Sequence, residues 1–183
     1  MELSIVLAGF GGQGALFGGQ LLAYAGMDTG QHVTWIPSYG PEMRGGTANC
    51  TVLVADNPIG SPIVAHPDVA LVFNGPSFDK YEPLVAVDGL LVVNSAIVRA
   101  VSERNDLEAI YVPANRIAEE FGTAKMLNMA MVGATLARRP FLSLGAVEAA
   151  LRNHLPASKA HLLEQNLAVL RRGFEMARST LPA

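Results

Sequence analysis

The stretch from Leu3 to Met27, LSIVLAGFGGQGALFGGQLLAYAGM, decides the fold class of this 183-residue chain. It carries no charge and is long enough to cross a bilayer, but seven of its positions are glycine and two are glutamine. No basic residue precedes the apolar run, as a signal peptide would require. We therefore predict a buried strand, a glycine turn and a helix over residues 14–29, and no membrane segment.

Further apolar runs of strand length alternate with stretches of helix length. Strands are predicted at Leu3–Ala8, His32–Ile36, Ala48–Ala55, Val69–Asn74, Leu90–Asn94 and Leu107–Val112. Helices are predicted at about 14–29, 77–86, 114–138, 144–154 and 158–179. Several strands are continuous Val/Ile/Leu runs, which are typical of a sheet buried on both faces. The pattern indicates a Rossmann-like α/β fold, a mostly parallel sheet with helices on both faces, forming a single domain over residues 1–183.

One segment, residues 37–68, departs from this alternation. Ala48–Ala55 follows a loop rich in glycine and proline, and the short run Pro62–Ala65 comes soon after it. No stretch of helix length separates the two runs. We therefore predict a short antiparallel excursion around 37–68.

Composition excludes several classes of protein. Half of the residues are hydrophobic and 16% are charged, so the chain can offset the entropy of ordering and is not disordered. The single cysteine, Cys50, cannot form a disulfide framework or a zinc or iron–sulfur ligand set, and it suits a reducing, cytoplasmic location. The net charge of -3 includes no dense Lys/Arg stripe, so nucleic-acid binding is not expected.

Residues 9–14, GFGGQG, satisfy G-x-G-x-x-G between a predicted strand and a predicted helix. Such glycines let backbone N–H groups approach a phosphate at the positive end of a helix. The alternative is a turn that only packs the helix closely on the sheet. A dinucleotide site also needs an acid at the end of the second strand, and Trp35–Ser38 contains none. The lysine of a P-loop is missing too, since Ala15 and Leu16 occupy the Lys and Ser/Thr positions.

Residues 35–49, WIPSYGPEMRGGTAN, form the least generic part of the sequence. Two prolines and three glycines constrain the backbone, and Arg44 is the only base in the first 79 residues. A guanidinium beside exposed N–H groups suits an anionic ligand or a partner carboxylate. The alternative is a surface ion pair between Arg44 and Glu42, which contributes little.

Together with GFGGQG, the segments VTWIPSYGPEMRGGTANCTV, SPIVAHPDVALVFN, LLVVNS and KMLNMAMVGA resemble the gamma subunit of the 2-oxoacid:ferredoxin oxidoreductases. The resemblance runs in order from about residue 3 to residue 137. The form YGPEMRGGTAN is more similar to the 2-oxoglutarate and branched-chain 2-oxoacid types than to the pyruvate type.

The resemblance implies membership of a complex that oxidatively decarboxylates a 2-oxoacid and forms an acyl-CoA, with ferredoxin as electron acceptor. It implies alpha and beta subunits as partners, with a small ferredoxin-like delta subunit as a further candidate. Thiamine diphosphate, Mg²⁺ and the iron–sulfur clusters would lie in other subunits, with coenzyme A as co-substrate. This chain lacks the Gly-Asp-Gly pattern that holds a magnesium diphosphate, so we expect no catalytic residue and no metal in the chain alone.

The resemblance also assigns candidate cofactor-binding residues. The glycine turn, residues 9–14, supplies Gly9, Gly11, Gly12, Gln13 and Gly14. The signature loop, residues 35–49, supplies Tyr39, Gly40, Arg44, Gly45, Gly46, Thr47 and Asn49. We hypothesise that the two loops meet at the carboxyl edge of the sheet and line the path of coenzyme A or the 2-oxoacid. The alternatives are a free-standing NAD(P)-dependent oxidoreductase and a binding module outside any redox complex.

A few other polar residues have weaker patterns. We expect none of His32, His66, His154 and His161 to be catalytic or a ligand, because they lack metal spacing and acids nearby in sequence. Cys50 is expected in the core. Asn128 is expected to bond buried backbone, and Asn94 and Ser95 to cap the following turn.

Overall fold

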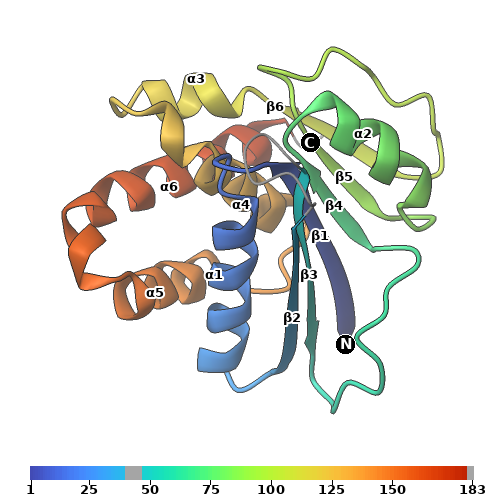
Figure 1. Cartoon of the computed structure of the whole chain (residues 1–183), viewed down its shortest axis with the longest axis horizontal. Coiled ribbons are helices and arrows are strands. Elements are labelled where there is room, and N and C mark those ends of the chain that lie inside the picture. The colour runs from blue at the N-terminus through green and yellow to red at the C-terminus, as the bar shows by residue number, and fades with distance from the viewer. Residues whose placement is uncertain (40–46, 181–183) are drawn as a thin grey trace.

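The computed structural model describes residues 1–39 and 47–180. In these ranges the chain forms a six-stranded sheet in the order β2-β3-β1-β4-β5-β6 (Figure 1). Its strands are β1 (Glu2–Phe10), β2 (His32–Tyr39), β3 (Thr47–Ala55), β4 (Val69–Val72), β5 (Leu90–Asn94) and β6 (Glu108–Val112). Each of them overlaps one of the apolar runs from which strands were predicted.

Strands β1, β4, β5 and β6 form the parallel half of the sheet. Ile5 of β1 lies beside Val69, the first residue of β4, and Val69 lies beside Leu90, the first residue of β5. Every residue of β4 and β5 is buried. Continuous burial on both faces explains why these strands read as unbroken apolar runs, and it confirms the predicted α/β class.

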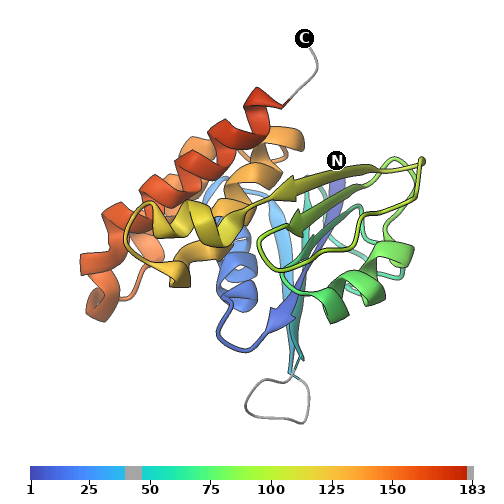
Figure 2. The same ribbon diagram turned by 90° about the horizontal axis from the view of Figure 1, so that it is seen from above.

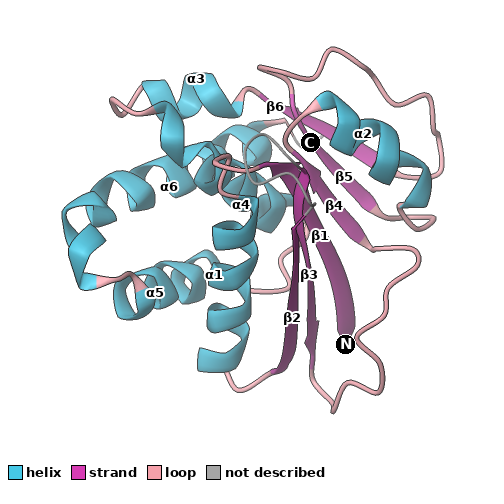
Figure 3. Cartoon of the chain, in the orientation of Figure 1, coloured by secondary structure: helices cyan, strands magenta, loops and turns pink. Residues whose placement is uncertain are grey.

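Strand β3 lies between β2 and β1 and is antiparallel to both. It pairs with β1 from Thr47, opposite Phe10, to Ala55, opposite Glu2. The antiparallel excursion predicted around 37–68 is therefore confirmed, but the prediction was wrong about the pairing of Pro62–Ala65. Those residues form no strand and lie in the loop between β3 and β4 (Figure 3). Both edges of β3 are already occupied, because β1 and β2 pair with it along its whole length and almost its whole length, respectively.

Helices cover both faces of the sheet (Figure 2). The larger core joins strand side chains such as Ile5, Leu7 and Val52 to helices α1, α3, α4, α5 and α6. The smaller core joins the opposite face, through Val6 and Ala8, to α2. The helix bounds are α1 (Ala15–Asp28), α2 (Gly75–Tyr81), α3 (Ala114–Glu119), α4 (Leu127–Arg138), α5 (Leu144–His154) and α6 (Leu163–Ser179).

The single helix predicted over 114–138 was wrong, because the chain breaks it into α3, the 3-10 turn η2 (Ala124–Met126) and α4. Gly122 adopts φ +80, a left-handed conformation that ends a helix, and the Thr123 side chain accepts a hydrogen bond from the Lys125 N–H to start the next turn. Shorter 3-10 turns, η1 (Glu82–Leu84) and η3 (Ala157–Leu162), also replace parts of the helices predicted at 77–86 and 158–179.

Helices α4 and α6 cross in close contact through two glycines. A Cβ on Gly133 of α4 would collide with the Leu170 carbonyl of α6, and a Cβ on Gly173 would collide with the Ala130 backbone. Ten of the twelve α4 residues are buried, as expected for a helix that is apolar on every face. In the described part of the chain, no helix combines the length and apolar character needed to span a membrane.

Candidate functional site

The two halves of the chain leave the sheet in opposite directions between β1 and β4. β1 continues through α1 to β2 on one side, whereas β4 continues through α2 to β5 on the other, with the two helices on opposite faces. The chain therefore turns towards opposite faces of the sheet at the adjacent carboxyl ends of β1 and β4. Open α/β sheets bind their ligands at such a point. The glycine turn follows β1 at this point, and Phe73 and Asn74 follow β4.

The glycine turn, residues 9–14, joins β1 to α1 with a geometry that requires glycine. Gly12 has φ +96 and Gly14 has φ +79, and Gly14 is the N-cap residue of α1. A Cβ on Gly14 would lie 2.7 Å from the Asn128 amide, and a Cβ on Gly9 would lie 2.9 Å from Phe73 Cβ. Conformation and close packing together account for these glycines, in agreement with the interpretation of the motif as a closely packed turn. The interpretation of the motif as a phosphate site stays a prediction.

The amino end of α1 has no side-chain cap among the described residues, and its first turn contains no acid. No atom of the described residues lies within 4 Å of the position that a Gly11 Cβ would occupy. A helix end carries about half a positive charge on its unpaired N–H groups. Such an end attracts phosphate and carboxylate groups.

Side-chain amides hold the turn in place. Gln13 Oε1 accepts hydrogen bonds from the Phe10 N–H at 2.7 Å and from Asn74 Nδ2 at 3.1 Å, and Gln13 Nε2 donates to the Phe73 carbonyl at 3.3 Å. Asn74 Oδ1 in turn accepts from the Ser77 N–H at 2.9 Å and caps α2. The turn after β1 is thus bonded directly to the chain that leaves β4.

Three further asparagines extend this network, and we call Gln13, Asn74, Asn94, Asn115 and Asn128 the amide cluster. Asn94 Nδ2 donates to Asn115 Oδ1 at 2.9 Å and lies 3.5 Å from the Phe73 carbonyl. Asn128 Nδ2 donates to the Gly14 carbonyl at 3.1 Å, which confirms its predicted bond to buried backbone. Asn94 Oδ1 accepts from the Ala96 N–H at 3.3 Å, as expected of a residue that caps the following turn.

Sequence reasoning missed Asn74 and Asn115 as parts of this site. Asn74 lies two residues after the end of β4 and Asn115 three residues after the end of β6, and the carboxyl ends of parallel strands meet at one edge of a sheet. That position was the available signal, but it does not say which amides will contact one another. Gln13 and Asn74 are 61 residues apart in sequence, and Asn128 is 114 residues from its Gly14 partner.

The signature loop begins and ends beside the glycine turn. Tyr39 is the last residue of β2 and pairs with Ala48, while Thr47 opens β3 opposite Phe10. Asn49 lies opposite Ala8 and is half-buried. Among the predicted site residues, Gly40, Arg44, Gly45 and Gly46 lie outside the described residues. The described ends of the two loops therefore share the carboxyl edge of the sheet.

The amide cluster contains no titratable group, so it can bind and orient a ligand but cannot transfer a proton. Cys50 lies beneath it in β3, and its thiol donates a hydrogen bond to the Ala15 carbonyl at 3.6 Å. Burial raises the pKa of Cys50 to about 11. A buried, protonated thiol is a poor nucleophile, in agreement with its predicted place in the core.

The described residues include no group of three or more His, Cys, Asp or Glu side chains that could hold a metal ion. Two of the histidines have hydrogen-bond contacts far from the glycine turn. His66 Nδ1 lies 3.2 Å from the Leu84 carbonyl, and His154 Nε2 lies 3.0 Å from the Asp28 carboxylate. Neither contact involves the amide cluster.

The strand order gives no support to a free-standing NAD(P)-binding enzyme. In the dinucleotide-binding fold the strand after the first helix pairs with β1 and ends in an acid that holds a ribose hydroxyl. Here β3 separates β2 from β1, and Tyr39 ends β2. The glycine turn therefore lacks the neighbouring strand end that a dinucleotide needs.

Comparison with known proteins finds a family match over most of the chain. Residues 4–176 match the model of the family described as pyruvate ferredoxin/flavodoxin oxidoreductase. Ketoisovalerate oxidoreductase subunit VorA of Methanothermobacter marburgensis is 39% identical over 98% of this chain and 37% of VorA. The chain thus spans little more than a third of that relative. 2-Oxoglutarate synthase subunit KorC of Methanocaldococcus jannaschii is 30% identical over 97% of this chain and 95% of KorC.

Two solved structures share the fold. The gamma subunit of a keto/oxoacid ferredoxin oxidoreductase from Geobacter sulfurreducens is 26% identical, with a TM-score of 0.85 over 98% of each chain. A 2-oxoglutarate:ferredoxin oxidoreductase from Magnetococcus marinus, with 2-oxoglutarate, coenzyme A and succinyl-CoA bound, has a TM-score of 0.89 at 22% identity. It matches 100% of this chain but only 32% of its own length, and at this identity the likeness concerns the fold alone.

Proposed function

The chain belongs to the pyruvate ferredoxin/flavodoxin oxidoreductase family, and on that premise we propose that it is the gamma subunit of a 2-oxoacid:ferredoxin oxidoreductase. The complex would convert a 2-oxoacid and coenzyme A into acyl-CoA and CO2, reducing two one-electron ferredoxins and releasing one proton. The likeness to a gamma subunit over 98% of both chains supports this assignment. Residues 1–183 would act as one domain.

In this proposal the chain binds and positions, while other subunits catalyse. The observation that carries it is the uncapped end of α1 beside a cluster made only of amides, which in the described residues offers hydrogen bonds and no titratable group. Alpha and beta subunits, and a delta subunit where one exists, would hold the thiamine diphosphate, Mg²⁺ and clusters. In the VorA relative the matching region is part of a chain nearly three times longer, so there other domains are covalently attached.

Coenzyme A is the ligand that best fits the glycine turn. Its phosphates suit the positive end of α1, and its pantetheine amides suit the neutral amide cluster. The Magnetococcus enzyme with the same fold holds coenzyme A and succinyl-CoA. We propose that Gly9, Gly11, Gly12, Gln13, Gly14, Tyr39, Gly40, Arg44, Gly45, Gly46, Thr47 and Asn49 line the path of coenzyme A or of the 2-oxoacid.

Two 2-oxoacids are the leading substrates. Sequence motifs favour 2-oxoglutarate or a branched-chain 2-oxoacid over pyruvate, and the two relatives described above are named for ketoisovalerate and for 2-oxoglutarate. We retain 2-oxoglutarate as the first substrate to assay and ketoisovalerate as the second. Turnover of pyruvate at a higher kcat/KM than either would contradict this order.

The assignment is tested by co-expressing the chain with its thiamine-binding and cluster-bearing candidates. We expect the subunits to co-purify and to reduce ferredoxin when both the 2-oxoacid and coenzyme A are present. A chain that purifies alone and binds NADH tightly would overturn the proposal.

The path is tested in the assembled enzyme with Gly11→Leu and a matched Gly60→Leu control. A Cβ at either position would have no described atom within 4 Å, and neither glycine has the left-handed φ, but Gly60 lies in the loop between β3 and β4. We expect Gly11→Leu, and likewise Arg44→Ala, to raise the apparent KM for coenzyme A or the 2-oxoacid about tenfold, the equivalent of about 1.4 kcal/mol. Unchanged affinities for both, in a complex that still assembles, would refute the role of these loops.

A further inference from the structure

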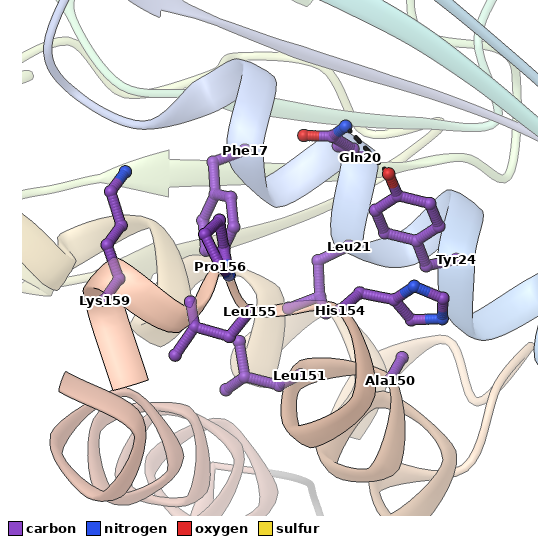
Figure 4. Close-up of a pocket in the computed structure, with 10 residues that line it drawn as sticks. All are labelled: Phe17, Gln20, Leu21, Tyr24, Ala150, Leu151, His154, Leu155, Pro156 and Lys159. Carbon is purple, nitrogen blue, oxygen red and sulfur yellow. Dashed lines mark hydrogen bonds between the residues drawn. The ribbon is translucent and has the colours of Figure 1, made fainter. Parts of the chain in front are cut away.

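A cavity lies away from the glycine turn, between α1, α5 and the start of η3 (Figure 4). Its volume is about 190 Å³. Apolar walls come from Phe17 and Leu21 of α1 and from Leu151 and Leu155 at the end of α5. An apolar cavity of roughly 150 Å³ is enough to bind benzene, so this one can hold a single ring or a branched chain.

One wall of the cavity is fixed before any ligand arrives. The ring of Tyr24 stacks on His154, with centroids 4.1 Å apart and planes 5° apart. His154 Nε2 lies 3.0 Å from both Asp28 carboxylate oxygens, which ties the end of α5 to the end of α1. Gln20 Nε2 donates to the Tyr24 hydroxyl at 3.2 Å. A wall held at each step in this way loses little entropy on binding.

The polar groups around the cavity differ in how they are used. His154 is engaged by Asp28, whereas the Lys159 ammonium has no ion pair or hydrogen bond with any described residue. Lys159 lies at the end of the cavity beside Phe17, and the Tyr24–His154 stack lies at the opposite end (Figure 4). An apolar chamber with one uncommitted cation at one end matches a ligand with an apolar body and one negative group.

We propose that this cavity, lined by Phe17, Leu21, Leu151 and Leu155 with Lys159 at one end, binds a small apolar carboxylate. The ring or branched chain enters between α1 and α5, and the carboxylate pairs with Lys159. The site is separate from the carboxyl-edge site but shares α1 with it, since Phe17 lies three residues after Gly14. Occupancy would therefore brace the helix that carries the glycine turn.

The test uses the full chain and two probes of the same shape, phenylacetate and phenylacetamide, followed by amide NMR. For a ligand of about ten heavy atoms we expect a Kd on the order of 1 mM for phenylacetate. Phenylacetamide, which lacks the charge, is expected to bind about threefold or more weakly at low salt. Shifts are expected at Phe17, Tyr24 and Leu151. Equal affinities for the two probes, or shifts confined to the glycine turn, would overturn the proposal.

Variants separate the cation from the chamber. Lys159→Gln is expected to lower the affinity for phenylacetate to that for phenylacetamide. Lys125 is an exposed lysine on η2, and Lys125→Gln is expected to leave the affinities for both probes unchanged. Leu155→Trp fills the chamber and is expected to abolish binding of both probes. If that variant fails to fold, the two-probe comparison on the unaltered chain still decides. Binding to the free chain that disappears in the assembled enzyme would show that a partner polypeptide fills the cavity and would also refute a small-molecule site.

Discussion

At the residue scale, Gly14 combines two requirements that a matched pair of variants can separate. Gly14 and Gly30 have nearly the same φ, +79 and +82, but only Gly14 has an Asn128 amide in the space of a Cβ. Gly30→Ala is expected to cost about 1–2 kcal/mol of unfolding free energy, the cost of a left-handed L-residue. Gly14→Ala is expected to cost roughly 1–3 kcal/mol more, because the added methyl also overpacks the contact with Asn128. Urea unfolding measures both changes in unfolding free energy. Equal losses for the two variants would show that overpacking against Asn128 does not contribute.

The raised pKa of Cys50 predicts the direction in which the stability of the chain changes with pH. Burial raises its pKa from 9.0 to about 11, so the folded chain keeps the proton over a range where the unfolded chain releases it. Folded-state stability is therefore expected to fall as pH rises from about 9 towards 11. Cys50→Ala or Cys50→Ser should lose this part of the pH dependence. Iodoacetamide labelling, followed by mass spectrometry, should be slow in the folded chain and fast in urea, and fast labelling of the folded chain would contradict the assigned burial.

Sequence could predict the glycine turn, Gln13 within it and the bond of Asn128 to backbone, but not the contact of Gln13 with Asn74. The signal for the turn is local in sequence, because the apolar run from Leu3 and the G-x-G-x-x-G motif that ends at Gly14 directly precede a helical pattern. The bond between Gln13 and Asn74 depends on β4 lying beside β1, which no local pattern contains. Of the predicted site residues in the signature loop, only Tyr39, Thr47 and Asn49 lie among the described residues, so the placement of Arg44 stays a prediction.

At the element scale, the α4–α6 crossing depends on the two glycines that replace side chains at the contact. Gly133→Ala is expected to destabilise the chain by about 3 kcal/mol or more, because the added methyl meets backbone of α6 and cannot rotate away. Gly145→Ala in α5 is the control: its nearest neighbour is 4.0 Å away, so we expect a gain of up to about 1 kcal/mol from helix propensity. Thermal unfolding by circular dichroism distinguishes them. If Gly133→Ala left the stability of the chain unchanged, α4 and α6 would be able to move apart without loss of unfolding free energy.

Elements were predicted best where burial is continuous. The run Leu90–Asn94 is a strand with the predicted bounds because all five residues are buried. The predicted helix over 114–138 failed because Gly122 breaks a segment whose flanks both have helical patterns. A lone glycine inside such a pattern is usually tolerated, so the break needed the tertiary contacts of α3 and α4 with the same core.

At the scale of the whole molecule, the two faces of the sheet are not covered alike. α1 packs on one face of β2 and β3, through Trp35 and Val52 among others. On the opposite face, α2 contacts a core to which neither β2 nor β3 contributes in the described residues. Ile36 on that face is 44% exposed and Phe10, at the end of β1, is 36% exposed. Farther along the same face Leu53 is only 2% exposed, so the exposed part, which we call the open face, lies near the carboxyl edge and adjoins the described ends of both loops.

If the chain assembles as proposed, the open face is the surface on which another subunit completes the site. Ile36→Lys is then expected to leave the thermal midpoint of the isolated chain nearly unchanged, because the side chain is already half in water. The same change should reduce co-purification of the chain with its thiamine-binding partner at least tenfold, since a buried unpaired ammonium costs more than about 1.4 kcal/mol. Val101→Lys is the matched control, because Val101 is also apolar and 69% exposed but lies in the loop between β5 and β6. Equal recovery of both variants with the partner would place the subunit contact elsewhere on the molecule.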